Sequence, residues 1–131
     1  MFHLAILKTK YYNMILNGSK PIESRFSFNK IAPYKKVCVG DTLYLKQTGK
    51  PVDVKCEVER VEFFELTPDI VEDIRLNYGS LIGTDNVKDW ESTKQKKYGT
   101  LVWVKNVKKI KPIVVPRSNG AAWFVLENDL I

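Results

Sequence analysis

The chain has 131 residues, of which 44% are hydrophobic and 27% charged, and its formal net charge is +6. This size and balance predict one globular domain over residues 1–131, with a core that needs neither disulfides nor metal. No apolar run reaches the ~18 residues of a membrane helix, and the apolar start, residues 1–8, is too short for a signal peptide. We therefore expect a cytoplasmic protein with no membrane partner.

The positive charge is divided unevenly along the chain. Residues 1–60 carry eleven Lys/Arg and five Asp/Glu (net +6), residues 61–95 carry three and eight (net −5), and residues 96–131 carry seven and two (net +5). If the two basic flanks pair in one sheet, the acidic segment lies apart from it. Such a field suits RNA, DNA or a phosphorylated small molecule, although a solubilising lysine surface gives the same pattern.

Extended and helical segments alternate along the chain. The strand pattern recurs in seven stretches, at residues 2–7, 22–28, 42–45, 52–64, 99–108, 110–115 and 122–126, from which we expect about six strands. A short helix is predicted from Thr9 to a stop at Gly18. A second helix is predicted over residues 68–79 with Thr67 as its cap, and a short third over residues 87–90. The sequence therefore predicts an α+β fold: a small, mostly antiparallel β-barrel with a helix after the first strand and a helical insertion before the last strands.

The sequence offers little metal or thiol chemistry. Cys38 and Cys56 lie in strand-like apolar context outside any CxxC pattern, so we expect both to be buried free thiols. His3 is the only histidine, and it lies in an apolar strand, where a structural role is more typical than a catalytic one. We therefore expect no metal site and no cofactor. Neither a nucleophilic triad nor a phosphate-binding glycine loop occurs in the sequence.

The candidate site is the stretch from Asn17 to Arg25, where a helix turns on Gly18 and the chain becomes extended. Within six residues it presents Lys20, Glu23 and Arg25. Because a strand alternates faces with a period of two, Glu23 and Arg25 project to one side. A lysine can act as a general base or phosphate clamp, a glutamate can relay protons, and an arginine can hold phosphate bidentately. The alternative is a surface ion pair worth under about 1 kcal/mol.

Three residues outside this stretch complete the predicted ligand-binding set. Tyr12 or Trp123 would stack on a base beside the cations. Arg117 is included for its charge and for its place in a predicted turn over residues 116–120. The aromatic positions are also typical of core residues, so packing is the alternative for both.

Residues 18–25, with the sequence GSKPIESR, follow a tyrosine-rich helix and precede VGDTL at residues 39–43. This arrangement resembles the ASCH family (activating signal cointegrator homology), whose signature is G-x-K-x-x-E-x-R followed by a V-G-D strand start. The long strand over residues 52–65 and the LTP at residues 66–68 also look like the family. The resemblance covers residues 2 to about 110.

The resemblance implies a PUA-like β-barrel with a cleft beside the first helix. Lys20, Glu23 and Arg25 would line that cleft and bind RNA or nucleotides. Some members of the family are amidohydrolases that remove the acyl group from acetylated cytidine with a Lys, a Thr and a Glu, and others are ribonucleases. This chain keeps the lysine of the amidohydrolase pattern at Lys20 but has Glu23 where those enzymes carry threonine.

Three functions therefore remain open at the level of sequence. The first is a module that binds RNA or a nucleotide in the cleft. The second is an enzyme in the same cleft, a ribonuclease or an acetylcytidine-type amidohydrolase, with Lys20 as base or electrostatic catalyst and Glu23 as proton relay. The third is a protein-interaction module that docks through the acidic segment, residues 62–91. Only the enzyme would lose turnover and keep ligand affinity when Lys20 or Glu23 is replaced.

Overall fold

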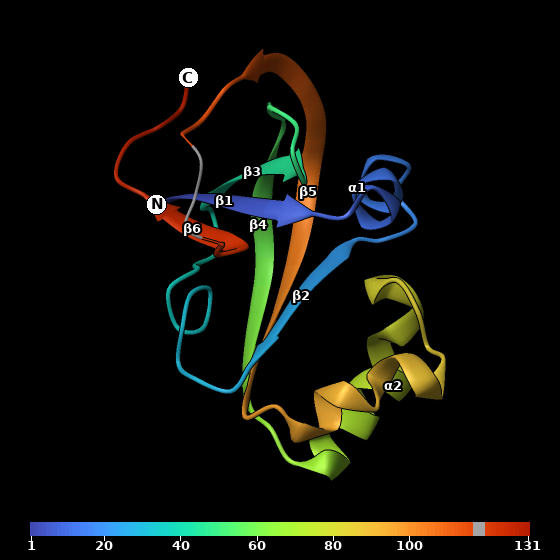
Figure 1. Ribbon diagram of the computed structural model, residues 1–131. Helices are drawn as coiled ribbons and strands as arrows, with labels where there is room; N and C mark the ends of the chain where they lie inside the picture. The colour runs from blue at the N-terminus through green and yellow to red at the C-terminus, as the bar shows by residue number, and fades with distance from the viewer. Residues whose placement is uncertain (117–119) are drawn as a thin grey trace.

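Six strands form one mixed sheet, which is curved (Figure 1). The computed structural model describes residues 1–116 and 120–131. The strands stand in the order β2-β5-β4-β3-β1-β6; β1 and β3 are parallel, and all other neighbours are antiparallel. Their bounds are β1 Phe2–Leu7, β2 Ile22–Ser27, β3 Thr42–Gln47, β4 Val52–Glu65, β5 Tyr98–Ile113 and β6 Trp123–Leu126. The predicted α+β fold with a mostly antiparallel sheet is confirmed.

The helices occupy the two predicted places in the chain. Helix α1 (Thr9–Leu16) follows β1, and α2 (Pro68–Ile82) with the 3-10 helices η1 (Val87–Trp90) and η2 (Ser92–Gln95) lies between β4 and β5. Thr67 caps α2 as predicted, because its hydroxyl accepts a hydrogen bond from the amide of Ile70. Within the described part of the chain, each helix is too short or too polar to cross a membrane.

Helix α2 continues past Gly79, where the sequence predicted its end, to Ile82. Gly79 serves close packing instead, because a Cβ at this position would lie 2.9 Å from the Cα of Asp85. The helix ends at Gly83, whose φ of +140° is a conformation that side chains disfavour. The extra turn carries the carbonyl end of α2 toward the candidate site.

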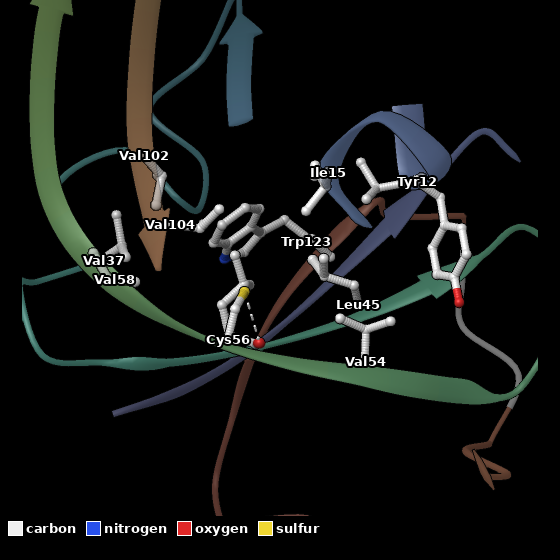
Figure 2. Close-up of a cluster of buried hydrophobic side chains, with 13 residues drawn as sticks. Tyr12, Ile15, Val37, Leu45, Val54, Cys56, Val58, Val102, Val104 and Trp123 are labelled. Atoms are coloured by element: carbon white, nitrogen blue, oxygen red, sulfur yellow. Dashed lines mark hydrogen bonds between the residues drawn. The ribbon is translucent and has the colours of Figure 1, made fainter. Parts of the chain in front are cut away.

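The main hydrophobic core lies between the sheet and α1. Alternate residues of β4 point into it, among them Val54 and Val58, which are fully buried. Tyr12 and Ile15 of α1 and Trp123 of β6 pack against the same cluster (Figure 2). Each aliphatic side chain buried in this way contributes about 1.5–3 kcal/mol to folding, so the cluster fixes α1 on the sheet.

A second core holds the helical insertion against the other edge of the sheet. Val71 and Ile74 of α2 and Trp90 of η1 pack on Ile22 and Leu101, which belong to β2 and β5. Apart from residues 61–65 at the end of β4, the acidic segment of the sequence is mostly helical and lies outside the sheet, which the basic flanks largely form. This packing places the insertion directly beside the stretch that carries Lys20, Glu23 and Arg25.

The expectation that both cysteines are buried is wrong for Cys38. Cys38 is exposed in the loop before β3, where its amide donates to the carboxylate of Asp41. Cys56 is buried as predicted, and burial raises the pKa of its thiol to about 12. Its Sγ lies 3.3 Å from the carbonyl oxygen of Leu43 (Figure 2). The apolar neighbours of Cys38 suggested a strand, but hydrogen bonding to Asp41 holds this segment in a turn.

Candidate functional site

A cleft of about 730 Å³ opens where the curved sheet does not close on itself. Strands β2 and β6 are the two edges of the sheet. Residues of β2, the end of β1 and the segment before β6 line the cleft, and α1 and the helical insertion complete it. Its lining includes the side chains of Lys8, Tyr11, Lys20, Glu23, Arg25 and Trp90. The volume is typical of small-molecule sites, which span roughly 300–1,000 Å³.

Lys20 is held at the cleft wall by backbone carbonyl groups. Its side chain is almost completely buried, and its Nζ donates to the carbonyl oxygen of Ile22 (2.8 Å) and to that of Ile82 at the end of α2. The carbonyl end of a helix carries partial negative charge, which stabilises a nearby ammonium. Burial nevertheless lowers the pKa of Lys20 below its ordinary value, and the carboxylate of Glu23 opposes this effect.

Tyr11 packs beside the same ammonium group. The Nζ of Lys20 lies 5.5 Å from the centroid of the Tyr11 ring, a cation–π distance. Gly83 permits this arrangement, because a Cβ on Gly83 would lie 2.9 Å from the ring. The turn after α2 thus serves the site in two ways: it ends the helix beside Lys20 and leaves room for Tyr11.

Glu23 lies between two cations and has spare capacity to accept hydrogen bonds. Only 4% of Glu23 is exposed. Its Oε1 accepts from the amide of Ser24 (2.8 Å) and lies 3.7 Å from the Nζ of Lys20. Its Oε2 lies 3.7 Å from a terminal nitrogen of Arg25 and accepts no hydrogen bond from the described residues. Since buried polar atoms nearly always have a partner, this oxygen is an exception that needs a reason.

Arg25 connects the two edges of the open sheet. From β2, its guanidinium donates to the carbonyl oxygen of Ile6 in β1 (3.1 Å) and to that of Ala122 before β6 (3.2 Å). Its central carbon lies 5.5 Å from the centre of the Trp123 ring. The Nε of Arg25 is also buried without an acceptor among the described residues. These contacts fix a positive charge in the wall of the cleft.

The structure therefore brings Lys20, Glu23 and Arg25 together, as the sequence predicted. It does not bring Trp123 to the cleft surface as a free stacking ring. Trp123 is 6% exposed, packs in the main core behind Arg25, and donates its Nε1–H to His3 (3.2 Å). Its contribution to the site is to support the guanidinium.

The other two residues predicted to bind the ligand are Tyr12 and Arg117. Tyr12 is buried in the main core, and its hydroxyl donates to Asp53 (2.9 Å) and accepts from Lys109 (2.9 Å). It is absent from the cleft lining, so the stacking role predicted for Tyr12 does not fit its position. Arg117 lies outside the described residues.

Sequence reasoning missed the parts of the cleft that α1 and the helical insertion supply. Lys8 and Tyr11 flank the start of α1, and Trp90 comes from η1, where its indole donates to the carbonyl oxygen of Thr84 (2.8 Å). Successive helical residues point about 100° apart, which is about the width of an apolar stripe, so Tyr11 and Tyr12 can both lie on it. The sequence therefore did not show that Tyr11 faces the cleft while Tyr12 is buried in the core.

The cleft can hold an anionic group, accept hydrogen bonds and contact a flat apolar ring. The cations of the cleft can hold the anionic group, Glu23 can accept the hydrogen bonds, and the rings of Tyr11 and Phe26 can contact the flat ring. Over residues 1–116 and 120–131, no three His, Cys, Asp or Glu side chains gather in a way that could hold a metal ion.

Comparison with known proteins identifies the fold. No family model matches the chain, and no curated protein matches it. Among solved structures, the ASCH protein of Zymomonas mobilis is 13% identical with a TM-score of 0.73, over 96% of this chain and 87% of that chain. A point variant of that protein is 14% identical with a TM-score of 0.74, over 96% and 88%. The hypothetical protein PH0355 is 16% identical with a TM-score of 0.55, over 84% and 100%.

The chain therefore has an ASCH-like fold. The predicted resemblance is confirmed for the fold. With identities this low, the similarity says nothing about which ligand the cleft takes.

Proposed function

We propose that the cleft binds RNA or a nucleotide. The proposal rests on one observation: cations, aromatic rings and a buried carboxylate line the same cleft. Cations suit the phosphate groups of a nucleic acid, and rings such as those of Tyr11 and Phe26 suit the faces of its bases. The ASCH-like fold agrees with the proposal but does not carry it.

The cations of the cleft differ in how they would contact phosphate. Lys8 is exposed and takes part in none of the ion pairs formed by the described residues. Its ammonium is therefore available to a phosphate, and a contact of this kind positions a strand without reading its sequence. Lys20 and Arg25 are held by backbone carbonyls, so they would supply a fixed positive field.

Glu23 would contact the base. The amino groups of cytosine, adenine and guanine are hydrogen-bond donors, and a carboxylate accepts from such groups. The Oε2 of Glu23 lacks a donor among the described residues. A base amino group could therefore donate a hydrogen bond to this oxygen if the cleft wall shifted slightly to admit it. This pairing predicts preference among bases, whereas phosphate contacts do not.

The first test uses labelled single-stranded RNA at several salt concentrations, from about 50 to 200 mM. We expect the affinity of the wild type to fall steeply with salt. Replacing Lys8 with alanine should reduce the slope of log affinity against log salt by about 0.7, the value for one phosphate contact of a single strand. Lys111→Ala removes an equal charge near the far end of β5 and should leave the slope unchanged. An affinity that does not depend on salt would contradict the proposal.

The same assay tests the role of Glu23. Glu23→Gln keeps the shape of the side chain but places an N–H donor where an acceptor stood. Since a good base contact is worth about 1–3 kcal/mol, we expect roughly five- to hundredfold weaker binding of the preferred base and reduced discrimination among bases. An affinity equal to that of the wild type for all four homopolymers would exclude this role.

A second candidate function is an enzyme in the same cleft, either a ribonuclease or an acetylcytidine-type amidohydrolase. It is favoured by the buried Lys20, whose pKa is lowered by burial and which lies 3.7 Å from Glu23, because buried lysines with lowered pKa values serve as bases. Incubation of RNA and of acetylated cytidine with the wild type tests it. An enzyme should lose turnover but keep ligand affinity in Lys20→Ala and Glu23→Gln.

A further inference from the structure

An aromatic and basic surface lies where β2 ends and β5 begins. We call it the Phe28 surface and define it as Phe28, Lys30, Lys96 and Lys97. Phe28 is 52% exposed, and the ammonium of Lys96 lies 4.2 Å from the centre of its ring. The two chain segments are held together by a hydrogen bond from the amide of Lys97 to the carbonyl oxygen of Ser27 (2.9 Å).

The lysines of this surface are not paired with acidic side chains in the described part of the chain, although Glu65 of β4 lies opposite Tyr98, the residue after Lys97. Its three lysines take part in none of the ion pairs formed by the described residues. The sequence from residue 26 to residue 40 contains three lysines and no Asp or Glu. What sets Phe28 apart from the other exposed apolar side chains is the group of unpaired lysines around its ring, and this combination suits a partner that is both flat and negatively charged.

The Phe28 surface continues the wall of the cleft. Phe26 lines the cleft and packs edge-to-face on Trp90, with ring centroids 5.6 Å apart. Phe28 follows two residues later, in the bend directly after the end of β2. On the opposite side, Thr93 lines the cleft and Lys96 follows at the end of η2. Both rims of the cleft thus lead to this surface.

We propose that a single-stranded nucleic acid with one nucleotide in the cleft continues over the Phe28 surface. This inference rests on the proposed function and names its ligand as an oligonucleotide rather than a free nucleotide. Phe28 stacks on a neighbouring base, and the lysines contact the phosphates on either side of it. Aromatic platforms flanked by lysines bind single strands in this way with little sequence preference.

The test is a length series of labelled RNA, from a mononucleotide through strands of about three, six and twelve nucleotides, the range that one such domain covers. We expect affinity to rise with length until the Phe28 surface is filled. Phe28→Ala should weaken the longer strands by roughly five- to hundredfold, the effect of losing one stacked base, and leave the mononucleotide unchanged. Phe28→Tyr retains a ring and should bind as the wild type does.

The lysines are tested separately from the ring. The double variant Lys96→Ala/Lys97→Ala should lower the salt slope of the long strands by about 1.4, because each phosphate contact contributes about 0.7. The matched control is Lys108→Ala/Lys111→Ala, which also removes two exposed lysines, in the part of β5 far from the Phe28 surface. This control should change neither the dependence of RNA affinity on strand length nor the slope of log affinity against log salt.

The outcomes separate the two proposals. Binding that does not increase with length, or a length gain that Phe28→Ala leaves intact, overturns the role of the Phe28 surface and leaves the cleft proposal standing. Absence of binding at every length overturns both. Because Ile31 is also exposed nearby in sequence, anionic lipid vesicles are a further probe. If Phe28→Ala abolishes vesicle binding without changing RNA binding, the surface belongs to a membrane contact and the proposal fails.

Discussion

Two buried polar clusters lie close to β1. The Asp41 cluster consists of Asp41, His3 and Trp123, and the Glu23 cluster consists of Glu23, Lys20 and Arg25. In the Asp41 cluster, the carboxylate accepts from the amino group of Met1 (3.0 Å), from His3 Nε2 (2.8 Å) and from the Cys38 amide (2.9 Å). The remaining ring nitrogen of His3 accepts from the indole of Trp123 (3.2 Å). Since an indole only donates, His3 carries its proton on Nε2.

The Glu23 cluster leaves two buried atoms without partners among the described residues, Oε2 of Glu23 and Nε of Arg25. A satisfied network rigidifies the fold, whereas an unsatisfied one costs stability unless something else completes it. This difference agrees with a structural role for the Asp41 cluster and with the ligand-binding role proposed for the Glu23 cluster. It also explains why the only histidine of the chain is not a catalytic candidate.

The largest effect should come from breaking the Asp41 cluster. Asp41→Ala leaves His3 and the Cys38 amide buried without their acceptor, so we expect the free energy of unfolding to fall by about 3–5 kcal/mol. Urea denaturation measures it. Glu62→Ala, which breaks the exposed Arg60–Glu62 pair, is the control and should cost under about 1 kcal/mol. Equal losses in the two variants would contradict the comparison.

Asp41 should also contribute to unfolding in acid. Burial opposes ionisation of Asp41, but hydrogen bonds from His3, the Cys38 amide and the Met1 amino group outweigh it and hold the pKa of Asp41 below its ordinary value. Its contribution to stability is therefore complete above about pH 4 and is lost as the pH falls through the lowered pKa. The stability difference between wild type and Asp41→Asn should shrink over that range.

A smaller effect on stability is expected at Lys20, where the fold disfavours the charged form of the side chain instead of favouring it as at Asp41. Burial lowers the pKa of Lys20, so between that pKa and about 10.5 the unfolded chain binds a proton that the folded chain has released. The free energy of unfolding of the wild type, relative to Lys20→Met, should therefore rise as the pH increases through this window. Urea titrations from neutral to alkaline pH measure the difference. A difference independent of pH would mean that the ammonium is fully stabilised by its carbonyl partners.

The smallest effect is expected from the two neighbouring tyrosines. Tyr12→Phe removes a hydroxyl bonded to Asp53 and Lys109 and should cost about 1 kcal/mol of stability without changing RNA affinity. Tyr11→Leu removes a ring that lines the cleft and should weaken RNA binding by roughly fivefold or more. Loss of RNA affinity in Tyr12→Phe with none in Tyr11→Leu would reverse this assignment of the two rings.

Local chemistry was sufficient to predict most elements and the centre of the site. Alternation along β4, the Thr67 cap of α2 and the turn at Gly18 depend on residues adjacent in sequence, so the sequence alone identifies them. The spacing of Lys20, Glu23 and Arg25 along one turn and strand likewise brings the three together. For the same reason, the α+β fold and the place of the helical insertion were predictable.

Only the tertiary structure decided which side chains reach the cleft. The burial of Tyr12 and Trp123 follows from packing in the main core, to which several strands contribute, and the close approach of Asp85 to Gly79 accompanies the extension of α2. The missing partner of Glu23 likewise depends on where β1 and α2 lie. Such contacts join residues far apart in sequence, and their energies are set by shape and distance in the folded chain, which no local pattern records.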